Sequence, residues 1–549
     1  MKTLTFAMLT GLVGSLGGCA LEGSAGDADE SAEFSELDAV IARHGDDHNR
    51  LPNNVPMFDG DGVFTTVSSH GFIDLNNEFF QDLGSNGRRC VSCHVPSVGW
   101  TITPHQLQSV FEATDGGVFD DGFGLAAVFR TVDGSNSPTA DVSTLAKRRK
   151  AYSMLLNHGV VRVGLAVPAN AEFELVAVDD PYKFASAKEL SLFRRPLPTA
   201  NLKFDSTVMW DGREVVPGAT VASELATQSS DAVLTHAQGQ PLSQAQRESI
   251  VGFEVALATA QVSDRGAGDL RVAGAQGGPT AILKQEFHIG INDNFGDPVT
   301  GKAFDPIVFN LFDRWANLSG GHDGGHDDHN CRDHRNHHGH GCNCDRHDDD
   351  DHGYGDNDRD DDRDSDHGDR GDDRRAYGRN SNHIGSMTDA RRAIARGQAL
   401  FNSHPIAIAG VSGINDEAVF GKPAVVMGTC TTCHDTPNGG NHSVVAPLNI
   451  GLVDEAHRTP DMPLYTLRNK TTGEIKKVTD PGRAMIDGKW SHIGRFKGPM
   501  LRDLAPRAPY FHNGFAKDLD AAVEFYDTRF NIGFSKQQKS DLVAFLRSL

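Results

Sequence analysis

Two copies of one short cysteine–histidine motif constrain this chain more than any other feature. They are Cys90-Val-Ser-Cys93-His94 and Cys430-Thr-Thr-Cys433-His434. Both match the C-x-x-C-H signature of covalent haem attachment. Two thiols at this spacing can each form a thioether to one haem, and the adjacent histidine can then ligate the iron. The sequence therefore predicts two covalently bound c-type haems. The alternative for either motif is a zinc half-site or a redox C-x-x-C.

The length and the charge of the chain limit the other possibilities. A chain of 549 residues is too long for one ordinary domain, so two or three domains are expected. The formal net charge of −22 argues against nucleic acid as a partner. This charge suits a basic redox protein as a partner, and a solvated acidic surface is the simpler explanation of it.

The N-terminus has the pattern of an export signal. An apolar run from residue 4 to residue 16 follows Lys2. The next residues, Leu16-Gly17-Gly18-Cys19, resemble a bacterial lipoprotein cleavage box. We therefore expect a signal peptide over residues 1–18, lipidation of Cys19 and a tether over residues 19–49. An ordinary signal peptide or an uncleaved anchor is the alternative. Lipidation predicts an exported, periplasmic or cell-envelope lipoprotein that meets the membrane through its lipid.

An unusual segment, residues 319–383, divides the chain. It holds nineteen aspartates, eleven histidines and nine arginines and almost no aliphatic residues, so it is predicted to be a disordered insert. Its histidines, with Cys331, Cys342 and Cys344, suit zinc, copper or nickel, the alternative being a solvated loop with incidental ligands. The other cysteines belong to the haem motifs and the lipid site. No structural disulfide is therefore expected in the folded core.

Each remaining segment, residues 50–318 and residues 384–549, contains one haem motif. A helix, then C-x-x-C-H, then a closing helix is the layout of a c-type cytochrome domain. We therefore expect a mainly α fold with two cytochrome c-like haem domains, long loops, a small β-hairpin insertion and the disordered insert. Capping boxes that begin at Ser243 and Ser535 mark two helix starts. The main expected elements are helices at 144–158, 241–261, 388–403 and 535–549 and a hairpin over 160–178.

Four motifs follow one another in an order that carries a family resemblance. They are Cys93-His94-Val-Pro96-Ser-Val-Gly99-Trp100-Thr101, the run 195–201, Trp210-Asp211-Gly212-Arg213 and the stretch 496–514. In these motifs the chain resembles the bacterial di-haem cytochrome c peroxidase family, which includes the MauG-type maturation enzymes. The resemblance covers both haem domains but neither the insert nor residues 118–193. It implies two haem domains that face each other across an inter-haem gap.

The resemblance implies a ligand for the second haem. Counted from His512, which matches the family's haem-side histidine, the axial-ligand position falls on Tyr526. Methionine there is typical of the peroxidases and tyrosine of the MauG type. A phenolate ligand favours oxidised iron and a low reduction potential. The alternative is that Tyr526 is a packed aromatic beside Phe525.

Two further positions take roles from the resemblance. Trp210 matches the tryptophan between the haems, where an aromatic ring can relay an electron, the alternative being ordinary core packing. Asn201, with the backbone carbonyls of Arg507 and Pro509, matches the positions that hold an inter-haem calcium. The resemblance therefore implies a possible calcium ion in addition to the two haems.

The chain departs from the family around the first haem. Peroxide cleavage needs a base beside the distal oxygen, but the family's catalytic-glutamate position is Ser230 here. Glu224 is our candidate catalytic residue, and His236 is the alternative, although neither is in register. The family's switchable distal histidine is also missing, since its expected position is Val110. Other possible distal ligands of the first haem are His70, His105 and Met154.

These patterns predict an exported di-haem oxidoreductase. The first haem, on His94, is the expected reaction site for hydrogen peroxide or dioxygen, and the second, on His434, is expected to receive or store electrons. Peroxide reduction with a small electron-donor protein and MauG-like oxidation of a substrate protein both fit. The alternative class is a non-catalytic electron-transfer cytochrome, in which a histidine or methionine closes the first haem.

Overall fold

The computed structural model describes residues 40–41, 43–46, 48–117, 124–318 and 386–549. The predicted signal peptide, Cys19, the tether up to residue 39 and the insert 319–383 lie outside the described residues. The described parts before residue 319 and after residue 385 belong to one compact unit. Among the described helices, none combines the length and the apolar character needed to cross a bilayer.

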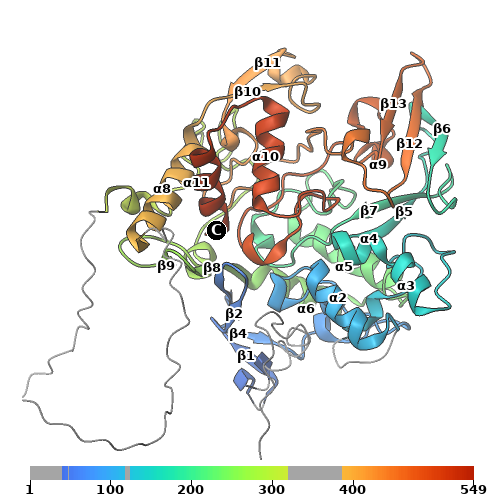
Figure 1. The fold of residues 1–549 in the computed structure, drawn as a ribbon, viewed down its shortest axis with the longest axis horizontal. Coiled ribbons are helices and arrows are strands. Elements are labelled where there is room, and N and C mark those ends of the chain that lie inside the picture. The colour runs from blue at the N-terminus through green and yellow to red at the C-terminus, as the bar shows by residue number, and fades with distance from the viewer. Residues whose placement is uncertain (1–39, 42, 47, 118–123, 319–385) are drawn as a thin grey trace, which may run out of the picture. The chain divides into compact units, whose positions relative to one another are not determined.

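Helices occur along the whole described chain (Figure 1). Ser243 and Gln246 form the expected capping box at the start of α6, and Ser535 and Gln538 form another at α11. In both, the serine hydroxyl accepts a backbone N–H and the glutamine returns the contact to the backbone N–H of the serine, as the sequence predicts. The helices are α2 (Pro104–Thr114), α3 (Leu145–Ala151), α4 (Ser153–His158), α5 (Val221–Thr235), α6 (Gln244–Ala256), α7 (Pro279–Leu283), α8 (Met387–Ser403), α9 (Ala484–Asp487), α10 (Leu519–Phe530) and α11 (Lys536–Arg547).

The described strands form five small antiparallel sheets, a larger strand content than the sequence suggested. Because the strand content is higher than expected, the division into two cytochrome c-like domains remains a proposal. The strands that pair are β1 (Arg50–Pro52) with β4 (Phe72–Asp74), β5 (Val161–Leu165) with β7 (Leu190–Arg194), and β10 (Ile406–Ala409) with β11 (Val425–Gly428). Larger sheets join β2 (Pro56–Phe58), β3 (Gly62–Ser68), β8 (Leu257–Asp264) and β9 (Gly268–Asp269), and join β6 (Phe173–Asp179), β12 (Leu464–Asn469) and β13 (Ile475–Val478).

The predicted β-hairpin over residues 160–178 is wrong. Both strands exist, but β5 pairs with β7, and β6 pairs with β12 from the far end of the chain. The reason is the burial of Phe173, which is fully covered and packs with Tyr465 and Leu467. The backbone at Glu172 is also bonded to the C-terminal half, through Gly488 and Lys470. A local hairpin would leave these apolar contacts unmade.

Two predicted helices have different limits in the structure. The helix expected over 241–261 ends at Ala256, and the chain continues directly into β8. Nearly all side chains of β8 are buried, because this strand pairs along its length with β3. The helix expected over 144–158 is interrupted at Tyr152 and becomes α3 and α4. The helix over 388–403 is confirmed as α8.

Residues on the two sides of the insert share one apolar core. Phe309, Phe312 and Trp315, which precede the insert, are fully buried against Phe401 of α8 and Phe545 of α11. Helices α8 and α11 lie side by side in Figure 1. The C-terminal helix thus closes the core around the second motif. That residues 50–318 and 384–549 form two separate haem domains remains a prediction.

A buried ionic network also connects the two halves. Arg194 at the end of β7 donates two hydrogen bonds to Asp480, at 2.7 and 3.0 Å, and one to Asp211, at 2.5 Å. Arg213 donates to both carboxylate oxygens of Asp211, one of which also accepts from Arg194. The Arg194, Asp211 and Asp480 side chains are at most 3% exposed. Removing one partner from such a network strands an uncompensated charge.

We predict that Arg194→Met lowers the free energy of unfolding by about 3–5 kcal/mol, because two buried carboxylates lose their partner. Urea denaturation of the haem-loaded protein measures this change. Arg468→Met is the matched control, since Arg468 pairs with Glu174 at the surface, where an ion pair contributes about 1 kcal/mol or less. Equal losses in the two variants would contradict the prediction.

Candidate functional site

Each C-x-x-C-H motif is folded as one tight turn. In the second motif, the backbone N–H groups of Cys433 and His434 both donate to the carbonyl of Cys430. The ring Nδ1 of His434 lies 2.5 Å from the carbonyl oxygen of Gly440. A carbonyl can only accept, so Nδ1 carries the proton and Nε2 is the nitrogen left to ligate a metal.

The first motif repeats this arrangement. The backbone N–H groups of Cys93 and His94 donate to the Cys90 carbonyl. Nδ1 of His94 lies 3.3 Å from the carbonyl oxygen of Trp100, which again leaves Nε2 for a metal. Burial lowers the pKa of His94 to about 4, so the ring is neutral at pH 7. Both motifs therefore present a neutral imidazole and two thiols, the groups that a c-type haem requires.

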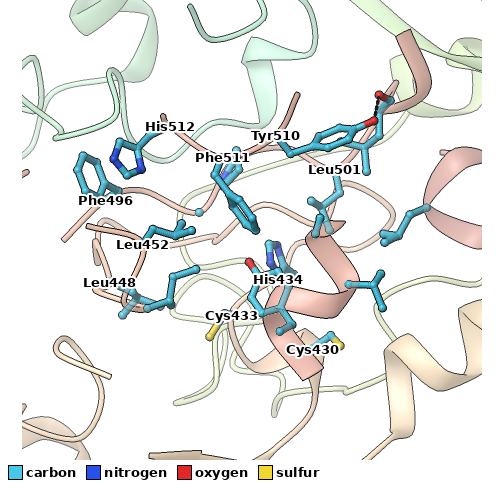
Figure 2. A pocket seen from close by; sticks show the side chains of 18 of the residues that line it. Cys430, Cys433, His434, Leu448, Leu452, Phe496, Leu501, Tyr510, Phe511 and His512 are labelled. Carbon is cyan, nitrogen blue, oxygen red and sulfur yellow. Dashed lines mark hydrogen bonds between the residues drawn. The ribbon is translucent and has the colours of Figure 1, made fainter. Parts of the chain in front are cut away.

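The second motif opens into a largely apolar pocket (Figure 2). Tyr526 on α10 lines this pocket together with Cys430, Cys433 and His434, as expected from the register with His512. Burial raises the pKa of the Tyr526 phenol, and the nearby Cys433 and Cys430 add a smaller effect in the same direction. The structure thus brings the predicted ligand and the second haem motif into one pocket.

Buried polar atoms in this pocket have no protein partner. Both ring nitrogens of His512, and Nη2 of Arg507, are buried without a hydrogen bond among the described residues. His512 stacks on Phe496 with ring centroids 4.0 Å apart, and Figure 2 shows the pair at the pocket. Buried groups of this kind are expected to find partners. A haem fits, because its macrocycle is apolar and its propionates would accept from these donors.

The first motif opens into a second pocket, which adjoins the first. Five residues line both pockets and so form a shared wall: Arg195, Pro196, Leu197, Pro198 and Trp210. Nε1 of Trp210 donates to the carbonyl of Arg195 at 2.8 Å. The Trp210 and His512 rings meet edge to face, 6.2 Å apart. Trp210 therefore lies between the two motifs, where the family resemblance puts it.

The pocket of the first motif contains titratable residues that the sequence did not single out. Glu254 on α6 lines it, is 4% exposed, and has a buried oxygen, Oε2, without a hydrogen bond among the described residues. Burial raises the pKa of Glu254 to about 8. The sequence feature that could have identified Glu254 is its position as the single charged residue in the apolar run Ile-Val-Gly-Phe-Glu-Val-Ala-Leu. Such a residue is a candidate for proton transfer.

His236 lines the same pocket. Its Nδ1 lies 2.6 Å from Oδ2 of Asp133, whose other oxygen pairs with Arg88. The carboxylate fixes Nδ1 as the protonated nitrogen and leaves Nε2 for other contacts. His236 is therefore oriented by a buried ionic pair, with 45% of its side chain exposed.

Glu224, our candidate base, does not line either pocket. It is buried, and its Oε1 accepts the backbone N–H of Val216 at 2.9 Å, which holds the loop before α5. The hydroxyl of Ser230 accepts the backbone N–H of Leu242. The structure therefore gives both positions contacts within the protein chain.

The other candidate ligands are also away from the described lining of the first pocket. Met154 is buried in an apolar cluster with Phe193 and Met462. Val110 lies on α2 and packs in an apolar cluster with Val95, Ile102 and Phe129. His70 and His105 are both exposed.

The positions predicted to hold calcium do not fit that ion. Oδ1 of Asn201 accepts the backbone N–H of Thr259 at 3.2 Å, and its Nδ2 donates to the Thr259 carbonyl at 3.0 Å. The Arg507 carbonyl accepts from the guanidinium of Arg195 at 3.1 Å. Calcium takes six to eight oxygen ligands, waters included. Of the three protein oxygens proposed, two already accept hydrogen bonds, and the Arg507 carbonyl accepts its bond from a cationic guanidinium that would repel a calcium ion. Within the described ranges, no group of three or more acidic, histidine or cysteine side chains is arranged for a metal.

Comparison with known proteins gives partial matches. No family model matches the chain. One stretch is 30% identical over 132 residues to the cytochrome-c peroxidase IdrP2 of Denitromonas iodatirespirans and covers 22% of this chain and 36% of that protein. Another is 39% identical over 69 residues to the cytochrome c551 peroxidase of Nitrosomonas europaea and covers 12% and 21%. A third is 38% identical over 89 residues to the cytochrome c peroxidase Ccp of Escherichia coli and covers 16% and 19%.

These matches cover about a third or less of each relative's length. They nevertheless name the same class of protein. Over the parts that align, the chain is similar to bacterial cytochrome c peroxidases.

Proposed function

We propose that this chain is an exported di-haem c-type oxidoreductase that reduces hydrogen peroxide at the first haem motif. The observation that carries this proposal is the pair of adjoining pockets, each with a C-x-x-C-H turn, which share a wall containing Trp210. The similarity to cytochrome c peroxidases supports it. Electrons enter through the second pocket from a small donor protein and reach the first by way of the shared wall.

The reaction takes up two electrons and two protons and converts one peroxide into two waters. Bound haem supplies the redox-active iron that exchanges electrons with peroxide. Cys90 and Cys93 would hold it through thioethers, and Nε2 of His94 would ligate the iron. The second site is built alike from Cys430, Cys433 and His434. The chain itself must then deliver the protons.

Glu254 is our proposed proton donor in the first pocket. A carboxyl with a pKa of about 8 is protonated at pH 7. It can therefore donate its proton to the hydroxide that leaves the peroxide, and the carboxylate can then be reprotonated from solvent. His236, held by Asp133 and partly exposed, connects the pocket to solvent. Glu224 is less suited than Glu254, because its oxygen holds the Val216 N–H.

We further propose that Tyr526 is the second axial ligand of the haem on His434. Its presence in that pocket favours a second candidate function, MauG-like oxidation of a substrate protein with peroxide or dioxygen as oxidant. In either case the phenolate keeps the second haem low in potential. Lipidation of Cys19 and attachment to the membrane complete the proposal, as the N-terminal sequence indicates.

Peroxide titration tests the function directly. We predict that the haem-loaded, reduced protein consumes hydrogen peroxide with two electrons per peroxide, and that its EPR spectrum contains a high-spin haem. Stopped-flow absorbance with and without an electron donor measures the consumption. Two low-spin haems that are inert to peroxide in every redox state would leave electron transfer as the function.

We predict that Tyr526→Phe raises the potential of the second haem by on the order of 100 mV, within the ~0.8 V range that axial ligands span. Spectroelectrochemical titration measures it. Tyr510→Phe is the matched control, because Tyr510 lines the same pocket but its hydroxyl already donates to the Leu504 carbonyl. If both variants keep the native potential and spectrum, Tyr526 is not a ligand.

We predict that Glu254→Gln slows the reaction with peroxide about 100-fold, because it removes the proton donor. In the native protein the rate should fall as pH rises through about 8, where the Glu254 carboxyl loses its proton. The variant should lack this limb of the pH profile. Glu224→Gln serves as the control and should keep both the rate and the profile. The reverse ranking of the two variants would contradict the assignment.

A further inference from the structure

Arg195 occupies the centre of the wall that the two pockets share. It is 6% exposed. Its guanidinium donates to three backbone carbonyls, those of Ile102 at 2.8 Å, Arg507 at 3.1 Å and His158 at 3.2 Å. These carbonyls come from distant parts of the sequence, so one side chain ties three segments together.

The backbone of Arg195 also bonds to both His512 and Trp210. Its N–H donates to the His512 carbonyl at 2.6 Å, and its carbonyl accepts from the indole of Trp210 at 2.8 Å. A single residue therefore sets the spacing between Trp210 and His512, which lie edge to face.

The charge of this guanidinium has no protein counterion in the described chain. Among the described residues Arg195 forms no ion pair with a carboxylate, unlike its neighbour Arg194. Burial, and the nearby Arg507, lower the pKa of Arg195 to about 9, so it is still charged at pH 7. A buried, unpaired charge is costly. Because Arg195 lines both pockets, its guanidinium could pair with the carboxylates that bound haems carry.

We propose that the Arg195 guanidinium is the fixed cation of the wall between the haems. By anchoring its own backbone, which bonds to Trp210 and His512, it positions those two residues without the help of a calcium ion. Arg195 holds the Arg507 carbonyl, while Asn201 is bonded to Thr259 on β8. Two of the three oxygen atoms proposed for a calcium site thus already accept hydrogen bonds within the protein. This inference rests on the proposed di-haem arrangement but not on reaction with peroxide.

Calcium content and thermal stability test the first part. The haem-loaded protein is dialysed against EGTA and then against calcium, and calcium per chain is measured by mass spectrometry. We expect substoichiometric calcium and the same Tm in both buffers, because a ligand that binds only the folded state would raise Tm. One calcium per chain, with a Tm that falls in EGTA and a loss of both effects in Asn201→Ala, would overturn the proposal.

Inter-haem electron transfer tests the positioning role. Its rate is measured by flash photolysis of the partly reduced protein, without peroxide. We expect Arg195→Met to slow it about tenfold or more, since small displacements of fixed groups have large effects. Arg195→Lys, which keeps the charge but loses the planar set of donors, should fall between Arg195→Met and the native protein. Arg271→Met, at an exposed surface pair, is the control.

The calcium measurements and the electron-transfer measurements test the two parts of the proposal separately. If Arg195→Met does not fold, the calcium measurements on the native protein still decide. Native electron-transfer rates in a folded Arg195→Met variant would overturn the positioning role. A protein that proves inert to peroxide would contradict the proposed function and leave both parts intact.

Discussion

The structure depends on how tightly the segment from Arg194 to Trp210 is held from both sides. Arg194 is clamped by Asp480 and Asp211, and Arg195 by backbone carbonyls of three other segments. Removing these interactions would loosen the contact between the N-terminal and C-terminal halves where the two pockets meet. Because buried charges of this kind are costly to leave unpaired, the wall has little freedom to move. Rigid spacing is what electron transfer between two sites requires.

The two pockets then differ in chemistry although their motifs are folded alike. The pocket around Cys430 and His434 is largely apolar and contains Tyr526, the proposed ligand, which as a phenolate would favour oxidised iron. The pocket around His94 contains Glu254 and His236, the two residues proposed to serve proton transfer. These side chains support the proposed division of roles, with proton-coupled chemistry at the first motif and electron input at the second.

Sequence reasoning succeeded where the signal was local. The C-x-x-C-H turns, the capping boxes of α6 and α11, and the placing of Trp210 and Tyr526 in the pocket linings all follow from short spacings or from one motif register. It failed where distant segments decide. The hairpin was wrong because β6 buries Phe173 against β12. Glu254 was missed because only the packing of α6 brings it to the first pocket. Nothing in the sequence indicated that two of the three oxygens assigned to calcium accept hydrogen bonds from Arg195 and Thr259.

The central claim is that both motifs hold covalent haem on the two sides of one wall. Intact-mass measurement of the purified protein, combined with its haem absorbance, tests this claim most directly. The account predicts two haem masses on each chain, and the loss of one when Cys90 and Cys93 are both replaced by serine. A chain that carries a single haem, or whose mass is unchanged by those replacements, would contradict it.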